Sequence, residues 1–289
     1  MAAIQGGRLV DQTQLRSPDL FGRTQRIDEA TLGVVAARLE VRGRHPFFRS
    51  AIDEYLAALD LAGTEAVLDL GCGTGVAARA VAARHGLRGP IAAVDISPHL
   101  VEAGRRLARE EGVGDRIGFR VGDAHALGLP AGGFDAVAMH TPLSHVAGPA
   151  EVLAEGRRLL RPGGGRPVVF DGDLASLTVA ADAPDRGQDT DAAVRRRLAA
   201  NPRVMRAMPR LLAEGGFGLF WSRGYLAADI GRLDVWASSM PGWRALLPKV
   251  GAMTEAEANA YVDGLERASA ENRFFGGSAF YGFIARRAG

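Results

Sequence analysis

Hydrophobic and polar positions follow two different patterns along this chain. In roughly the first sixty residues the apolar positions recur at helical spacing, and a helix is predicted after Pro46 that ends before Gly63. From residue 66 onward, short β-rich apolar runs alternate with helical stretches. The strands predicted there are Ala66–Leu70, Ile91–Asp95, Ile117–Val121, Phe134–Met139 and Pro167–Asp171, and the helices are Val76–His85, Pro98–Glu111 and Pro149–Leu160. This alternation indicates a parallel sheet covered by helices on both faces.

After residue 171 strands and helices no longer alternate regularly. The predicted elements are a loop over 182–191, helices around 191–200 and 203–214, a strand at 217–223, a mostly helical stretch over 227–270 interrupted at Pro241 and Pro248, and a last strand near 279–286. We therefore expect an α/β fold with a doubly wound, seven-stranded, mostly parallel sheet, forming one domain over 1–289. Its expected parts are an N-terminal helical cap (1–62), a Rossmann-like core (63–223), a helical insertion or lid (224–275) and the last strand (276–289).

Composition and charge narrow the class of protein. The 289 residues are 47% hydrophobic and 24% charged, which is typical of a globular enzyme. No run approaches the roughly 18 apolar residues of a membrane span, and the N-terminus lacks the basic and apolar blocks of a signal peptide. A cytoplasmic protein without membrane association is expected. The net charge of +2 comes from arginines scattered among acids, so no nucleic-acid-binding face is indicated.

Residues 67–75 read VLDLGCGTG, an apolar strand that runs into Gly71, Gly73 and Gly75 at the start of a helix. Glycines permit a tight turn and a close approach of the backbone to a ligand, and a helix N-terminus favours polar groups. The same spacing also fits a tight strand–helix turn without a ligand. A dinucleotide site would place its third glycine at Val76, so the pattern departs from the G-x-G-x-x-G form.

With Asp69 inside the strand, this segment resembles the first motif of the class I methyltransferases, E/D-x-G-x-G-x-G, which Asp69, Gly71, Gly73 and Gly75 match position for position. In that family the loop curves around the methionine part of S-adenosylmethionine. The resemblance therefore implies this cofactor, with Cys72 contributing mainly its backbone. Asp69 either orients the turn through backbone amides or meets the amino end of the cofactor.

Two further acids in chain order, Asp95 and Asp123, support the resemblance. Asp95 ends the second predicted strand, where an acid can accept hydrogen bonds from both ribose hydroxyls, and Ser97 is the more natural cap of the following helix. The resemblance implies that Ile96 lies against the adenine. It also implies that Asp123 bonds the adenine amino group and that the amide of Ala124 contacts the ring.

Candidate catalytic residues follow the fourth and fifth predicted strands. Methyl transfer from a sulfonium requires alignment in a dry pocket, and a base that titrates near the working pH is needed only when the nucleophile must lose a proton. His140, beside the expected sulfonium, and His145 are the candidates, and His140 is also a candidate cofactor contact. Asp171 could bind a substrate amine, act as a base or hold a metal. Alternatively, the histidines only position ligands and Asp171 caps a loop.

The expected partner is a small molecule. The resemblance is to the branch of the family that acts on quinones, sterols and specialised metabolites at oxygen, nitrogen or carbon. Aromatic residues of the cap and the insertion are candidates for the substrate pocket: His45, Phe47, Phe48, Trp221, Tyr225, Trp236 and Trp243. Residues 140–143 read HTPL, where nucleic-acid amino-methylating enzymes carry an Asn/Asp-Pro-Pro-aromatic motif, so nucleic acid is not expected as a substrate.

The sequence leaves alternatives open for the assembly and the function. The acidic set needed for metal-dependent catechol methylation is incomplete, so no metal is expected. A homodimer is one possible assembly. The other functions to be separated are an S-adenosylmethionine-binding cyclase or decarboxylase, a cofactor-binding protein without turnover, and a nicotinamide-dependent dehydrogenase.

Overall fold

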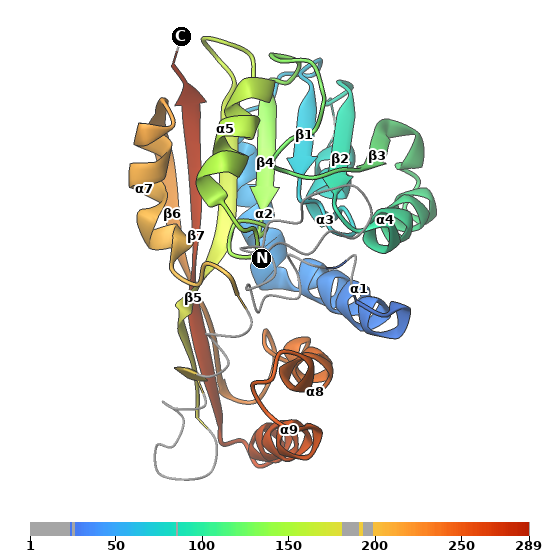
Figure 1. Ribbon diagram of the computed structural model, residues 1–289, viewed down its shortest axis with the longest axis vertical. Coiled ribbons are helices and arrows are strands. Elements are labelled where there is room, and N and C mark those ends of the chain that lie inside the picture. Colours follow the sequence, from blue (N-terminus) through green and yellow to red (C-terminus); the bar gives the residue numbers. More distant parts are fainter. Residues whose placement is uncertain (1–23, 25–26, 85, 181–190, 193–198, 289) are drawn as a thin grey trace, which may run out of the picture.

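The centre of the molecule is a seven-stranded sheet with the strand order β3-β2-β1-β4-β5-β7-β6 (Figure 1). The computed structural model describes residues 24, 27–84, 86–180, 191–192 and 199–288. Its strands are β1 (Val67–Leu70), β2 (Ile91–Asp95), β3 (Ile117–Val121), β4 (Ala136–His140), β5 (Arg166–Ala180), β6 (Phe217–Gly231) and β7 (Phe274–Arg287). Strands β1 to β5 are parallel, and β7 is antiparallel to both of its neighbours. The predicted seven-stranded, mostly parallel α/β fold is confirmed.

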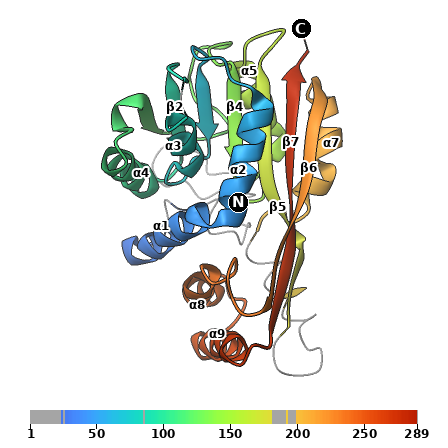
Figure 2. The same ribbon diagram turned by 180° about the vertical axis from the view of Figure 1, so that it is seen from behind.

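Helices cover both faces of this sheet. They are α1 (Glu29–Arg44), α2 (Pro46–Leu59), α3 (Val76–Ala82), α4 (Pro98–Glu110), α5 (Pro149–Leu159), α7 (Val204–Glu214), α8 (Ser239–Lys249) and α9 (Glu255–Ala270). Strand β1 is buried on both sides: Val67 shares one hydrophobic cluster with residues of α2 and α3, and Leu68 and Leu70 share the other with residues of α5 and α7. Figures 1 and 2 show the helices on the two faces of the sheet from opposite sides. None of the helices described is both long and apolar enough to cross a membrane.

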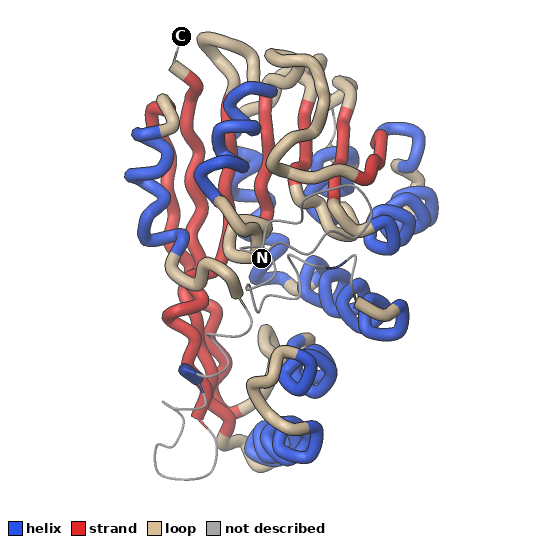
Figure 3. Tube along the Cα trace, in the orientation of Figure 1, coloured by secondary structure: helices blue, strands red, loops and turns tan. Residues whose placement is uncertain are grey.

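Strands β5, β6 and β7 are much longer than the other four, and together they extend beyond the parallel part of the sheet (Figure 3). In this extension β7 pairs with β5 up to Ala180↔Phe275 and with β6 up to Gly231↔Phe274. Helices α8 and α9 pack beside it. The extension therefore carries α8 and α9 beyond the parallel part of the sheet. There α8 packs against the N-terminal helix α1.

These long strands correct several predicted boundaries. Strand β5 continues past Asp171, residues 224–231 belong to β6 rather than to the helical insertion, and β7 begins at Phe274. Sequence preference is weak here because residues 224–231 are rich in glycine and alanine, and their pairing along β7 decides the conformation. Pro241 and Pro248 lie inside α8, near its two ends, and do not interrupt it. The predicted loop over 182–191 and helix over 191–200 lie almost entirely outside the described residues, as does His85.

Helix α1 connects the N-terminal cap to the glycine-rich turn. The Thr74 hydroxyl donates a hydrogen bond to Glu40 of α1 at 2.6 Å, and α1 also packs against α8. His45 caps the next helix, since its ring nitrogen accepts from the Phe47 amide at 3.2 Å. The cap and the helical insertion therefore meet over the edge of the sheet where the parallel strands end.

Candidate active site

The loops that follow β1 and β4 meet at the carboxyl edge of the parallel sheet. The chain runs from β1 outward through β2 and β3 and then returns to β4 on the other side of β1. Ligands of open α/β sheets bind at such a switch point. A Cβ atom added to Gly71 would lie 2.5 Å from Cβ of Pro142, so the two loops are in close contact there.

The glycine-rich turn has the left-handed backbone that its sequence predicts. Gly71, Gly73 and Gly75 have φ angles of +74°, +55° and +79°, a region that glycine adopts without the steric cost of a side chain. The amides of Gly71 and Cys72 both donate to the carbonyl of Val94, at 2.8 and 2.9 Å. The turn is therefore held to β2 by backbone bonds, and the side chain of Cys72 is buried.

Asp69 acts on this turn from inside the sheet. Its Oδ2 accepts a hydrogen bond from the amide of Ala78 in the first turn of α3 at 3.0 Å, and its Oδ1 is buried without a hydrogen-bond partner in the described part of the chain. Burial raises the pKa of Asp69 to about 7, and the charge of Asp95 adds to the rise. Of the two predicted roles, the contact with the helix amide supports orientation of the turn.

The raised pKa of Asp69 predicts a pH-dependent stability. The folded protein keeps the proton up to pH about 7, and the unfolded chain releases it near 3.8, so stability decreases as pH rises through this window. Relative to the wild type, we expect Asp69→Asn to gain about 2–3 kcal/mol in free energy of unfolding between pH 5 and pH 8.5. Urea denaturation at several pH values measures this, with Asp115→Asn as an exposed control; parallel curves for Asp69→Asn and the wild type would contradict it.

Asp95 lies where the ribose acid was predicted, at the end of β2. One carboxylate oxygen accepts from the Gly73 amide at 2.8 Å and the other from the Ser97 amide at 2.9 Å. Burial raises the pKa of Asp95, and these amide bonds limit the rise. Ser97 caps α4 as expected, accepting from the Leu100 amide, and Ile96 beside it is half-buried. Each carboxylate oxygen can accept more than one hydrogen bond, so Asp95 can join the turn to a ligand.

The residues predicted to contact adenine follow β3. The Asp123 side chain is 51% exposed, and its Oδ1 accepts from the His125 amide at 2.9 Å and lies 2.6 Å from the His125 ring nitrogen Nδ1. Partial burial opposes ionisation of Asp123, but the bonds from His125 lower its pKa overall. Ala124 is half-buried. His125 thus orients the Asp123 carboxylate.

His140 ends β4 among aromatic rings. Its Nδ1 lies 3.2 Å from the hydroxyl of Tyr55, and its ring stacks on Phe170 with centroids 4.9 Å apart. Desolvation, together with the charge of Arg42, lowers the pKa of His140 to about 3. The imidazole therefore stays neutral near pH 7 and does not titrate in the range expected of a general base. Its surroundings favour a positioning role.

Asp171 organises the loop that carries His145. The carboxylate is only 2% exposed and accepts hydrogen bonds from the Ser144 amide (2.9 Å), the Ser144 hydroxyl (3.0 Å) and the Gly172 amide (2.8 Å). Burial raises the pKa of Asp171, while the charge of His145 opposes that rise. Two of the predicted candidates, Asp171 and His145, therefore lie close enough to interact electrostatically.

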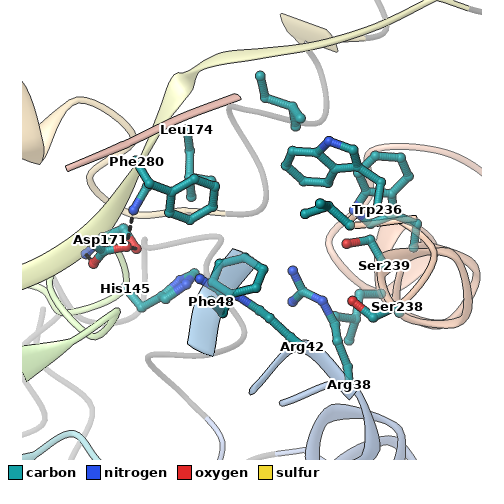
Figure 4. A pocket seen from close by; sticks show the side chains of 17 residues that line it. Arg38, Arg42, Phe48, His145, Asp171, Leu174, Trp236, Ser238, Ser239 and Phe280 are labelled. Carbon is teal, nitrogen blue, oxygen red and sulfur yellow. Dashed lines mark hydrogen bonds between the residues drawn. The ribbon is translucent and has the colours of Figure 1, made fainter. Parts of the chain in front are cut away.

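A cavity opens beside this pair (Figure 4). Of the aromatic residues proposed from sequence, Phe48, Trp236 and Trp243 line it. Four others make different contacts among the residues described: His45 bonds Asp234 and Tyr225 bonds Glu54, Phe47 packs on neighbouring rings, and Trp221 of β6 pairs with Ile284 of β7.

Arg38 and Arg42 also line this cavity, and the sequence reading missed both. Their spacing of four residues on a helix was the available signal, since it places both side chains on one face. Within the described ranges, no group of three histidine, cysteine, aspartate or glutamate side chains comes together as a metal site.

An open α/β sheet with a left-handed glycine turn and an acid at the end of β2 defines a Rossmann-like nucleotide-cofactor domain. Residues 67–164 match the family model of a methyltransferase domain. A putative methyltransferase of known structure from Bacillus halodurans C-125 superposes with a TM-score of 0.58 at 18% identity, covering 83% of this chain and 100% of its own. Residues 67–164 are thus similar to a methyltransferase domain, as the first motif indicates, and the superposition shows that the fold is shared.

Two curated relatives are similar over shorter stretches. An uncharacterised transposon protein of Streptomyces fradiae is 36% identical over 173 residues, 59% of this chain and 48% of its own length. A ubiquinone biosynthesis O-methyltransferase of Xanthomonas oryzae is 37% identical over 114 residues, 39% of this chain and 45% of its own length. The chain thus spans about half the length of these relatives.

Proposed function

We propose that this protein transfers the methyl group of S-adenosylmethionine to an oxygen, nitrogen or carbon atom of a small molecule. The observation that carries the proposal is the left-handed turn Gly71–Gly75, bonded to Asp95 at the switch point between β1 and β4. A relative named for ubiquinone biosynthesis, together with the aromatic lining of the cavity, supports a quinone or another aromatic metabolite as the acceptor.

The residues around the turn fit this cofactor. The backbone of Gly71, Gly73 and Gly75 leaves no side chain between the turn and a ligand, and a Cβ at Gly73 would already touch Leu39 of α1 at 3.0 Å. We propose that Asp95 accepts from the ribose hydroxyls and that the half-exposed carboxylate of Asp123 accepts from the adenine amino group. We propose that Ile96, Ala124 and His140 complete the cofactor site and that Cys72 contributes its backbone.

The bound cofactor supplies a methyl group already activated by a positively charged sulfur. The protein therefore mainly has to align the acceptor atom with the methyl carbon and the sulfur, and to exclude water from the site. Tyr55, His140 and Phe170 form an aromatic wall at the end of β4 that excludes water. When the acceptor must lose a proton, an imidazole nitrogen of His145 takes it, and Asp171 stabilises the imidazolium that forms. His140 stays neutral and positions the reacting groups.

Product mass tests the proposed function. Purified protein is incubated with S-adenosylmethionine carrying an isotopically labelled methyl group and a metabolite extract, and the products are analysed by mass spectrometry. We expect one compound to gain a single labelled methyl group, with an equal amount of S-adenosylhomocysteine released. A product with a changed skeleton and no label would indicate a cyclase or decarboxylase. Cofactor binding without any product would indicate a non-catalytic protein.

The cellular setting is also part of the proposal. We propose a cytoplasmic protein that binds neither nucleic acid nor membranes, with a homodimer as the assembly to test. Exposed apolar side chains on the edge strand β6, among them Phe220, Leu226 and Ile230, support association of two chains. Light scattering after size-exclusion chromatography should give the mass of two chains, and a one-chain mass at micromolar concentration would exclude the homodimer.

A further inference from the structure

Two arginines of α1 point into the cavity beside His145 and Asp171 (Figure 4). Arg38 and Arg42 lie one helical turn apart and are half-buried. The stem of Arg38 packs against Gly242 of α8, where a Cβ would lie 3.2 Å from its Cδ. Burial lowers the pKa of Arg38 to about 10 and that of Arg42 to about 9, the charge of Arg38 adding to the effect on Arg42. Both guanidinium groups therefore remain charged near pH 7, and two positive charges face one cavity.

Among the described residues, the guanidinium of Arg42 contacts aromatic rings rather than carboxylates. Within the described part of the chain its guanidinium forms no hydrogen bond or ion pair, and it lies over the rings of Phe48 and Phe280, with its Cζ 4.3 and 5.4 Å from their centroids. Asp171 attracts it, but the oxygens of Asp171 accept from Ser144 and Gly172. Desolvating a charge without a partner is costly.

Arg79 provides a comparison within the same protein. This arginine is 6% exposed, and it pairs with both Glu40 and Glu111. The fold thus surrounds a buried guanidinium with carboxylates where the arginine has a structural role. Among the described residues that line the cavity, Asp171 is the one acid, which leaves a place beside Arg42 for the anion of a ligand.

The position of the cavity indicates which ligand that anion belongs to. Its described lining includes His145 and Asp171 but none of the residues of the turn 71–75, and neither Asp95 nor Asp123. The rest of the described lining is mostly apolar or aromatic, with contributions from Phe48, Leu174, Leu177, Trp236, Trp243 and Phe280, and, besides the two arginines, its other polar members are Ser144, Ser238 and Ser239. A molecule in this cavity would thus be an acceptor held next to the cofactor site, with its body against apolar walls.

We propose that the methyl acceptor carries a carboxylate or phosphate group, which Arg38 and Arg42 bind while its apolar body fills the cavity. This inference rests on the proposed function for the identity of the cavity as the acceptor site. A guanidinium group binds carboxylate and phosphate oxygens through paired, charge-assisted hydrogen bonds. Two such groups next to aromatic walls select an anionic aromatic or polyene compound over its neutral analogue.

A matched pair of probes tests the charge requirement without turnover. The full-length protein, saturated with S-adenosylhomocysteine, is titrated with 2-naphthoate and with 2-naphthamide in a calorimeter. We expect the carboxylate to bind at least about tenfold more tightly than the amide, and Arg42→Gln to remove this preference. Arg42→Lys should retain part of it. Arg44→Gln, which changes an exposed arginine of the same helix (67% exposed), should behave as the wild type. Equal binding of the two probes by the wild type, or no binding of either, would overturn the proposal.

The carboxylate of the cofactor is the other source of such an anion, and a second measurement distinguishes it. The affinities of wild type and Arg42→Gln are compared for S-adenosylhomocysteine and for 5′-methylthioadenosine, which lacks the amino-acid part. We expect both affinities to change by less than about twofold, which also shows that the variant is folded. Weaker binding of S-adenosylhomocysteine alone would assign Arg42 to the cofactor and overturn the proposal. If the naphthoate preference holds but no extract compound is methylated, the proposed function fails and the anion site stands.

Discussion

Replacing Asp95 by alanine should weaken S-adenosylmethionine binding by about 100-fold or more while the chain stays folded. The substitution removes the two charge-assisted hydrogen bonds that we propose between Asp95 and the ribose, each contributing about 1.5–3 kcal/mol, so the expected loss of binding free energy is about 3–6 kcal/mol. It also removes the acceptor of the hydrogen bond that the Gly73 amide donates to Asp95 at 2.8 Å. Isothermal titration calorimetry gives the affinity, and circular dichroism together with thermal unfolding reports the fold.

The control for this experiment is Asp115→Ala. Asp115 is an exposed acid after α4, away from the turn, and we expect its removal to leave cofactor affinity unchanged and to alter stability by less than about 0.5 kcal/mol. Asp95→Asn provides an intermediate, because the amide can still accept one hydrogen bond but lacks the charge. Wild-type affinity in Asp95→Ala would contradict the placement of the cofactor at this switch point.

Local patterns were sufficient to predict the part of the fold that holds the turn. The positions of Gly71, Gly73 and Gly75 fix a left-handed turn, because only glycine adopts those angles without strain, and each parallel strand is an apolar run bounded by turn residues. The acids at 95 and 123 could be located because they follow predicted strands. These features depend on neighbours in the chain, so the sequence specifies them directly.

The rest depends on contacts between distant segments. Strands β5 and β6 continue along β7 for reasons of pairing, which the alanine- and glycine-rich stretch 224–231 does not reveal. The roles of Arg38 and Arg42 arise because α1 packs against α8 across the cavity. Burial and the charge of Arg42 lower the pKa of His140, and the rings of Tyr55 and Phe170 that lie against it come from other elements. Sequence spacing predicted that His140 ends the fourth strand and that His145 follows it, as the structure has them, but it could not indicate how the surroundings affect the protonation of His140.

The second large effect concerns His145, the candidate base. For an acceptor that must lose a proton, we expect His145→Ala to lower kcat by about 100- to 10,000-fold, the usual contribution of a positioned base, with cofactor affinity unchanged within about twofold. His145 lies in the loop that the hydrogen bonds from Ser144 to Asp171 hold in place. Replacing the His145 side chain therefore leaves the glycine-rich turn intact. Single-turnover rates with the acceptor found by mass spectrometry measure the effect, with His99→Ala on α4 as the matched control.

The pH dependence of that rate distinguishes a base from a positioning group. A base that must be neutral gives a wild-type rate that rises with pH through the pKa of the imidazole, and His145→Ala should lose this rise and regain part of the rate when free imidazole is added. His140 cannot produce such a rise near neutrality, because its pKa is about 3. Substituting His140 by asparagine should therefore lower the rate without moving the pH profile. An unchanged turnover in His145→Ala would show that the acceptor reaches the site already able to attack, as a carbon nucleophile or an ionised oxygen does.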